Sequence, residues 1–111
     1  MSENKKEFIE FLRILADQTR LDILELLQYE KKTSAEIQTE LKKSQSTISQ
    51  HLKALSNENL IIFDKINNVR SYKIKNSDIF KLLLKIKSFV TKINQEKLKD
   101  LGDLDVIDTL S

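Results

Sequence analysis

The residues best suited to chemistry in this chain are short polar side chains between Ser44 and Leu55, a stretch without any acidic residue. Hydroxyl, amide and ammonium groups donate hydrogen bonds to phosphate oxygens, and hydroxyls and amides also pair with base edges in the major groove of double-stranded DNA. This composition favours contact with nucleic acid. The candidate residues are Gln45, Ser46, Thr47, Ser49, Gln50 and Lys53.

Helical periodicity places these side chains together. At about 100° per residue, Ile48, Leu52 and Leu55 form one apolar stripe. The polar candidates Ser46, Gln50 and Lys53 lie on the opposite face, Thr47 and Ser49 on its flanks, and Gln45 in the first turn. Gln45 and Lys53 would lie nearer the DNA backbone. The alternative is an ordinary polar surface helix with a serine N-cap. Base contacts are expected from the remaining candidates, Ser46, Thr47, Ser49 and Gln50.

The segment before this helix predicts a second, shorter helix. Thr33 and Glu36 have the spacing of a capping box, which starts a helix near Ser34. That helix should end around residues 42–43, with Ser44 as the next N-cap, so the two helices have helix-turn-helix spacing. Because the turn contains no glycine, we expect ordinary backbone angles around Lys43.

The segment after the polar helix predicts a basic β-hairpin. Residues 60–65 and 70–75 are rich in strand formers, and the pair Asn67-Asn68 between them tolerates left-handed backbone angles. Asn59 should end the preceding helix, since asparagine substitutes for glycine at a C-cap. Two helices followed by a basic hairpin predict a winged helix-turn-helix fold, mainly α with a small β-hairpin. An edge hairpin with protective lysines is the alternative. Basic residues on or near this wing are Lys65, Arg70, Lys73 and Lys75.

Five sequence segments together resemble the ArsR family of winged-helix regulators. They are I-L-A-D-Q-T-R-L-D-I-L-E-L-L, T-S-A-E-I, S-Q-S-T-I-S-Q-H-L-K-A-L, N-L-I and V-R-S-Y-K-I, within residues 10–90. The resemblance implies a dimer that binds an operator with two recognition helices. Metal-sensing members use a cysteine-containing segment before the recognition helix, or histidine and aspartate ligands on the C-terminal helix, and this chain has neither.

Other site types lack the residues that they need. The chain has no cysteine and one histidine, His51, which excludes thiolate metal sites, iron–sulfur clusters and disulfide switches. His51 lies between the apolar stripe and its edge, so we expect it to make a packing or helix–helix contact. With Gly102 as the single glycine, the chain cannot form a nucleotide-binding phosphate loop. No group of residues suits catalysis, so we expect neither an enzyme nor a cofactor.

Length and charge predict one small domain, residues 1–101, and an acidic tail, residues 102–111. The 111 residues are 40% hydrophobic and contain neither a transmembrane stretch nor an export signal, so we expect a cytoplasmic protein without membrane contact. Between residues 42 and 75 there are seven lysines or arginines against two acidic residues, a net charge of +5. This basic segment coincides with the helix-turn-helix and hairpin, as DNA binding requires.

Apolar stripes near both ends of the chain predict dimerisation helices. The C-terminal helix should extend some 20 residues, with Leu82, Leu83 and Ile86 in the protein's own core. We therefore predict a homodimeric, sequence-specific DNA-binding transcription regulator that does not sense metals through cysteine. Its effector, if it has one, is unknown. The alternatives are a nonspecific architectural DNA-binding protein and a winged-helix protein-interaction module. The residues expected to face a second copy are Phe8, Phe11, Leu12, Phe89, Val90 and Ile93.

Overall fold

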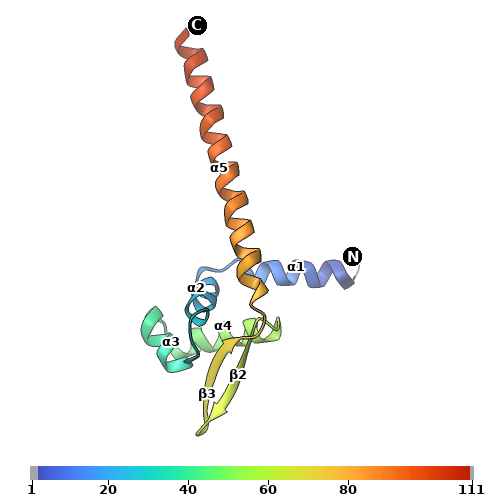
Figure 1. Cartoon of the computed structure of the whole chain (residues 1–111), viewed down its shortest axis with the longest axis vertical. Helices are drawn as coiled ribbons and strands as arrows, with labels where there is room; N and C mark the ends of the chain where they lie inside the picture. Colours follow the sequence, from blue (N-terminus) through green and yellow to red (C-terminus); the bar gives the residue numbers. More distant parts are fainter. Residues whose placement is uncertain (1–2, 111) are drawn as a thin grey trace. The chain divides into compact units, whose positions relative to one another are not determined.

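The computed structural model describes the backbone of residues 3–110 and the side chains of residues 3–102. The chain forms two compact units, Met1–Ser77 and Asp78–Ser111. The second unit is the helix α5 (Asp78–Leu110). The first unit holds the helices α1 (Glu3–Leu15), α2 (Gln18–Leu27), α3 (Ser34–Leu41) and α4 (Gln45–Asn57), and the strands β1 (Lys32–Thr33), β2 (Ile61–Ile66) and β3 (Val69–Ile74) (Figure 1).

The strands form an antiparallel sheet in the order β1-β3-β2. The predicted hairpin is confirmed, and its tip extends away from the helices α2, α3 and α4 of the same unit (Figure 1). Asn67 and Asn68 have φ of 53° and 64°, as a tight turn between two strands requires when both central residues are left-handed. The short strand β1, which pairs with Ser71 and Tyr72 of β3, was not predicted.

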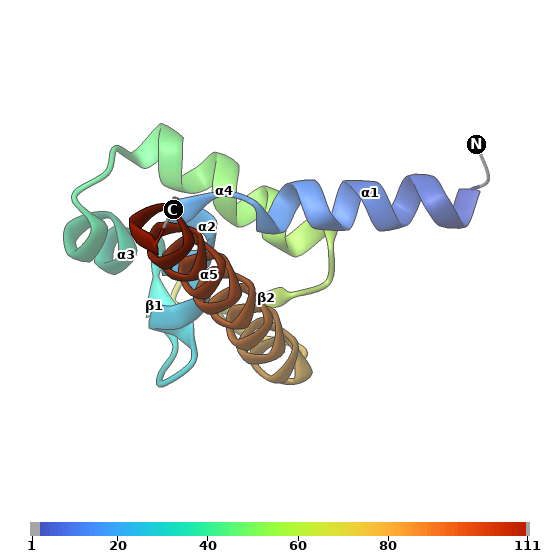
Figure 2. The same ribbon diagram turned by 90° about the horizontal axis from the view of Figure 1, so that it is seen from above.

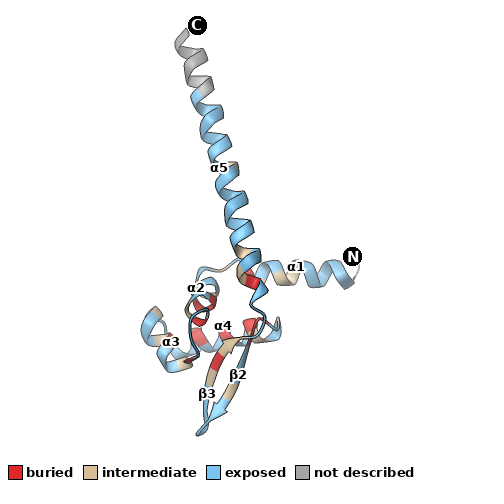
Figure 3. Cartoon of the chain, viewed as in Figure 1, coloured by how far each residue is buried: buried red, intermediate tan, exposed pale blue. Residues whose placement is uncertain are grey.

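The core of the first unit lies where the helices α2, α3 and α4 meet the sheet. Buried residues gather there, whereas the hairpin tip is exposed (Figure 3). At about 25 cal/mol per Å² of apolar surface, this burial is the main contribution to the stability of the unit. It also fixes which face of α4 turns outward. Fully buried side chains are Ile23, Leu24, Ile37, Ile48, Leu52, Leu55 and Ile61.

The helices α3 and α4 follow one another through a short turn (Figure 2), and α3 begins with the predicted capping box. Thr33 Oγ1 accepts from the Glu36 amide at 3.2 Å, and Glu36 Oε1 accepts from the Thr33 amide at 2.9 Å. The prediction of ordinary backbone angles in the turn was wrong, because Lys42 is left-handed, with φ 56° and ψ 46°. Its amide bonds the Gln38 carbonyl, so the helix ends as it would at a glycine.

The helix α5 has 33 residues and is longer than predicted. It continues through the expected acidic tail to Leu110, and the side chains of that tail from residue 103 onward lie outside the described residues. The placement of Leu82 and Ile86 in the core was wrong, since each side chain is 41% exposed. Among the described residues, no helix has both the length and the apolar character to cross a membrane.

Candidate nucleic-acid interface

The buried stripe of α4 confirms the predicted orientation of this helix. Ile48, Leu52 and Leu55 are at most 2% exposed, which turns the polar face outward. Thr47 is half-buried. The exposed candidates are Gln45 in the first turn of α4 and Ser46, Ser49, Gln50 and Lys53 on its polar face. Asn57, which the sequence interpretation missed, is exposed on the same face.

Ser44 caps α4 as predicted. Its Oγ accepts from the Thr47 amide at 3.2 Å and donates to Thr47 Oγ1 at 2.9 Å, and it lies 3.2 Å from Ser46 Oγ. Because Thr47 Oγ1 acts as the acceptor, its own proton remains available to a ligand. The cap therefore orders the hydroxyls at the start of the helix, which is where recognition helices contact base edges.

A groove of about 310 Å³ borders the second half of the same face. Gln50 and Lys53 line it from α4, and Glu10 and Ile14 line it from α1. Glu10 forms an ion pair with Arg13 one turn later. Among the candidate DNA contacts, Gln50 and Lys53 thus have α1 beside them, whereas Ser46 and Ser49 do not line this groove.

The hairpin divides the predicted wing residues between its two faces. Lys65 and Arg70 are direct cross-strand partners and share the face of Tyr72, which is turned toward the core. Lys73 is on the opposite face, where it pairs with Ile62. Lys65 and Arg70 are therefore brought together, and Lys73 is not.

Lys73 has a partner within the sheet. Its Nζ lies 3.3 Å from Asp64 Oδ2, and Lys31 Nζ lies 3.2 Å from the same oxygen. The hydrogen bonds from Lys31 and Lys73 lower the pKa of the Asp64 carboxyl. Because the Asp64 carboxylate pairs with Lys73, the net positive charge on that face of the wing is reduced.

Arg70 is held by an aromatic ring that sequence reasoning missed. Its guanidinium carbon lies 4.4 Å from the centroid of Phe63, which is diagonal to it across the strands. The ring of Phe63 packs in turn on Tyr72, with centroids 5.6 Å apart. The edges of a stacked guanidinium still carry its N–H donors, so Arg70 remains able to contact phosphate. The signal available in the sequence was the alternation of faces along each strand, which places Phe63 and Arg70 on the same face of the hairpin.

An ion-paired lysine anchors the short strand β1 beside α3. Lys32 is 6% exposed, and its Nζ lies 2.9 Å from Glu30 Oε1 and 3.0 Å from Glu40 Oε1. These hydrogen bonds, first to Glu30 and then to Glu40, raise the pKa of Lys32. Since Lys32 also pairs with Tyr72 of β3, this residue connects α3 to the base of the wing.

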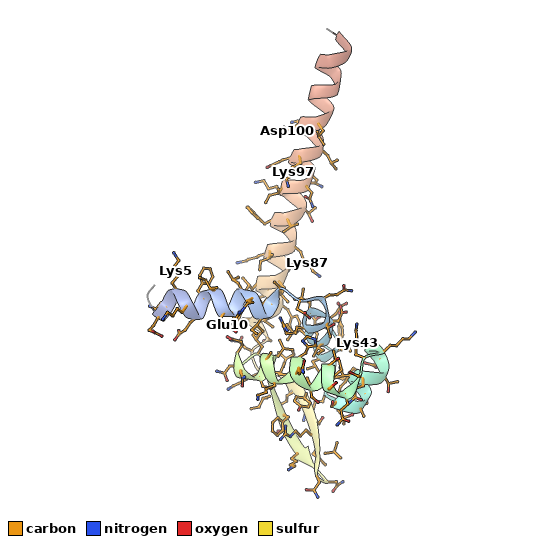
Figure 4. All side chains as sticks on the ribbon, turned by 180° about the vertical axis from the view of Figure 1, so that it is seen from behind. Lys5, Glu10, Lys43, Lys87, Lys97 and Asp100 are labelled. Carbon is orange, nitrogen blue, oxygen red and sulfur yellow. The ribbon has the colours of Figure 1, made fainter. Side chains whose placement is uncertain are left out.

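The net charge of +5 in residues 42–75 belongs to the segment that contains α4 and the hairpin. Lys43 projects from the turn before this helix (Figure 4). Surface charge of one sign attracts the phosphate backbone and makes binding depend on salt. Within the described part of the chain, no group of three or more histidine, cysteine, aspartate or glutamate side chains is placed to hold a metal ion.

The single histidine makes a helix–helix contact, as predicted. His51 Nδ1 lies 3.1 Å from Nη1 of Arg20 on α2. The ring is thus turned toward the body of the unit, away from the exposed hydroxyls and amides of α4.

Comparison with known proteins gives the family. Residues 17–62 match the model of bacterial regulatory proteins of the arsR family. The arsenical resistance operon repressor of Staphylococcus aureus is 32% identical over 72 residues, which cover 65% of this chain and 69% of the repressor. The arsenical resistance operon repressor of Staphylococcus xylosus is 29% identical over 104 residues, or 94% of this chain and 83% of that protein.

A solved structure has the same fold. It is the homodimeric winged helix-turn-helix DNA-binding domain of a possible ArsR-family transcriptional regulator from Mycobacterium bovis. The TM-score is 0.71 at 22% identity, covering 86% of this chain and 93% of that domain. The matched segment contains α2, α3 and α4. The chain belongs to the ArsR family of bacterial transcriptional regulators.

Proposed function

We propose that this protein is a transcriptional repressor that binds double-stranded DNA sequence-specifically as a homodimer. The observation that carries the proposal is the outer face of α4, which exposes hydroxyls, amides and a lysine but no carboxylate. Ser46, Thr47, Ser49 and Gln50 would contact bases in the major groove. Repression is the activity named for the two staphylococcal relatives.

Backbone contacts would come from the flanks of the recognition helix and from the wing. Gln45 and Lys53 lie at either end of the base-reading group, and Lys65 and Arg70 share one face of the hairpin. Lys73 would contribute less, because it lies on the other face with Asp64 as its partner. Phosphate contacts position the protein on the duplex, while the base contacts of α4 give the specificity.

The homodimer would form through exposed apolar faces of α1 and α5. Phe8 and Phe89 are 61% and 63% exposed, and Leu12 and Val90 are 44% and 48% exposed. Phe11 and Ile93 are half-buried beside them. Monomeric proteins rarely leave large apolar patches uncovered, and the related mycobacterial domain is homodimeric. Two recognition helices about 34 Å apart would fit successive major grooves.

Any effector would act without cysteine, since the 111 residues contain none. Cysteine thiolates are the ligands that soft metals prefer. We therefore propose that thiol-binding ions such as arsenite do not relieve repression by binding to side chains of this protein.

Selection of bound sequences from a random duplex pool tests the proposal. A homodimeric reader predicts enrichment of an inverted repeat whose half-sites are about 10 base pairs apart. A nonspecific architectural protein would enrich no sequence, and a protein-interaction module would retain no duplex even at low salt. Either of these two outcomes would contradict the proposed function.

The dimer has its own test with a matched control. Phe89→Glu should convert the protein to a monomer in sedimentation experiments and weaken operator binding. Tyr29→Glu introduces the same charge in place of another exposed aromatic side chain, 81% exposed in the turn after α2, and should leave the dimer intact. A dimer that survives Phe89→Glu unchanged would remove α5 from the interface.

A further inference from the structure

Arg20 of α2 connects three parts of the first unit through one guanidinium group. Its Nε donates to the carbonyl oxygen of Ile14, and its Nη2 donates to that of Arg13 at 3.3 Å. Its Nη1 lies 3.1 Å from Nδ1 of His51. All three nitrogens of the guanidinium are thus engaged, two by the end of α1 and one by the recognition helix α4.

The contacts with α1 fix the guanidinium. Arg13 and Ile14 are in the last turn of α1, whose final carbonyls have no partner within the helix. A cation at the carboxyl end of a helix also interacts favourably with the helix dipole. The backbone of Arg20 is fixed as well, since its amide donates to Asp17 Oδ1 at 3.0 Å at the N-terminus of α2.

The contact with α4 is directional. A guanidinium only donates hydrogen bonds, so Nδ1 of His51 is the acceptor in this contact. His51 follows Gln50 directly and lies one turn after Thr47, both proposed base contacts. A rotation of α4 about its axis would misdirect these side chains. A hydrogen bond to His51 therefore limits a movement that would disturb DNA contacts.

We infer that Arg20 is a positioning residue for the recognition helix, which it holds through His51 against the end of α1. This inference rests on the proposed DNA-binding function. Through this contact, α1 would have a role besides dimerisation. A movement of its last turn would displace the Arg20 guanidinium and, through His51, the DNA-contacting side chains of α4.

Two substitutions of His51 separate the hydrogen bond from simple packing. In His51→Asn, the amide oxygen takes the place of Nδ1 and can accept from Arg20. In His51→Leu, a side chain of similar bulk offers no acceptor. We expect His51→Leu to weaken binding to the selected duplex about tenfold, as for loss of a hydrogen bond to a charged group, and His51→Asn to remain within about twofold of wild type.

A control variant accounts for lost charge. Arg13→Gln removes a positive charge from the same end of α1, where the Arg13 side chain is 73% exposed, but keeps the backbone carbonyl that Arg20 uses. We expect it to change affinity less than Arg20→Gln does. Equal affinities of His51→Leu and wild type, or equal losses in His51→Leu and His51→Asn, would overturn the inference.

Amide hydrogen exchange tests the Arg20–His51 contact without DNA. His51→Leu should accelerate amide exchange in α4, whereas His51→Asn should not. Unchanged exchange at Ile23 and Leu24, which are fully buried in α2, would verify that the core of each variant is folded. If wild type binds no duplex, the proposed function fails, but this comparison still tests whether the Arg20–His51 hydrogen bond holds α4 in place. Equal exchange in α4 of both variants would overturn it.

Discussion

Replacement of Phe63 by leucine tests how the wing holds Arg70. The Arg70 guanidinium carbon lies 4.4 Å from the centroid of the Phe63 ring on an exposed hairpin, a geometry worth about 0.5–1 kcal/mol. Leucine keeps an apolar side chain but removes the ring. If stacking orients Arg70 toward the phosphate backbone, its loss should weaken DNA binding about two- to fivefold, since about 1.4 kcal/mol corresponds to a factor of ten.

A double-mutant cycle isolates this effect. Fluorescence anisotropy would measure the Kd for one labelled duplex with wild type, Phe63→Leu, Arg70→Ala and the double variant. The loss caused by Phe63→Leu should disappear when Arg70 is alanine, and it should persist in a Lys73→Ala background, because Lys73 lies on the opposite face of the sheet. Arg70→Ala should also reduce the slope of log affinity against log salt by about one.

The competing explanation is that Phe63 acts through folding. Its ring also packs on Tyr72, so Phe63→Leu could lower stability without any effect on Arg70. Thermal unfolding of all four proteins would report such a change. The same fold-loss in affinity with and without Arg70 would refute the stacking argument.

Three further predictions concern the elements that position the interface. Thr33→Ala removes the capping box before α3 and should lower the free energy of unfolding in urea by about 1 kcal/mol. Lys42→Gly relieves a left-handed backbone and should raise that free energy by about 0.5–1 kcal/mol, whereas Lys43→Gly, at a residue without positive φ, should not. An amide hydrogen bond lowers the pKa of Asp17 from its usual 3.8, so its stabilising effect is present above that pH and is lost as pH falls through the folded pKa. Asp17→Asn keeps the N-cap and should flatten the stability profile measured between about pH 2.5 and 5.

Local signals were sufficient to predict the helix-turn-helix. The Thr33–Glu36 capping box, the Ser44 cap and the stripe of Ile48, Leu52 and Leu55 each depend on residues close in sequence, and the structure has all three. The hairpin followed from the asparagine pair at its turn in the same way.

Features that depend on distant parts of the chain were not predicted. The strand β1 exists because Lys32 and Thr33 pair with β3, some 40 residues later. The pairing of Lys65 with Arg70 depends on the strand register, and the Arg20–His51 contact spans 31 residues. The left-handed Lys42 was missed for a different reason, since glycine or asparagine is the usual residue at such a position and neither is present.

The central claim is that α4 reads DNA sequence, and substitution of Gln50 tests it most directly. The measurement is the ratio of Kd for a scrambled duplex to Kd for the duplex selected by wild type. We predict that Gln50→Ala lowers this ratio about five- to 150-fold, the range of one base contact, while Gln28→Ala, at an exposed glutamine after α2, leaves it unchanged. A Gln50→Ala protein that loses affinity equally for both duplexes, or a wild type that binds both equally, would contradict the claim.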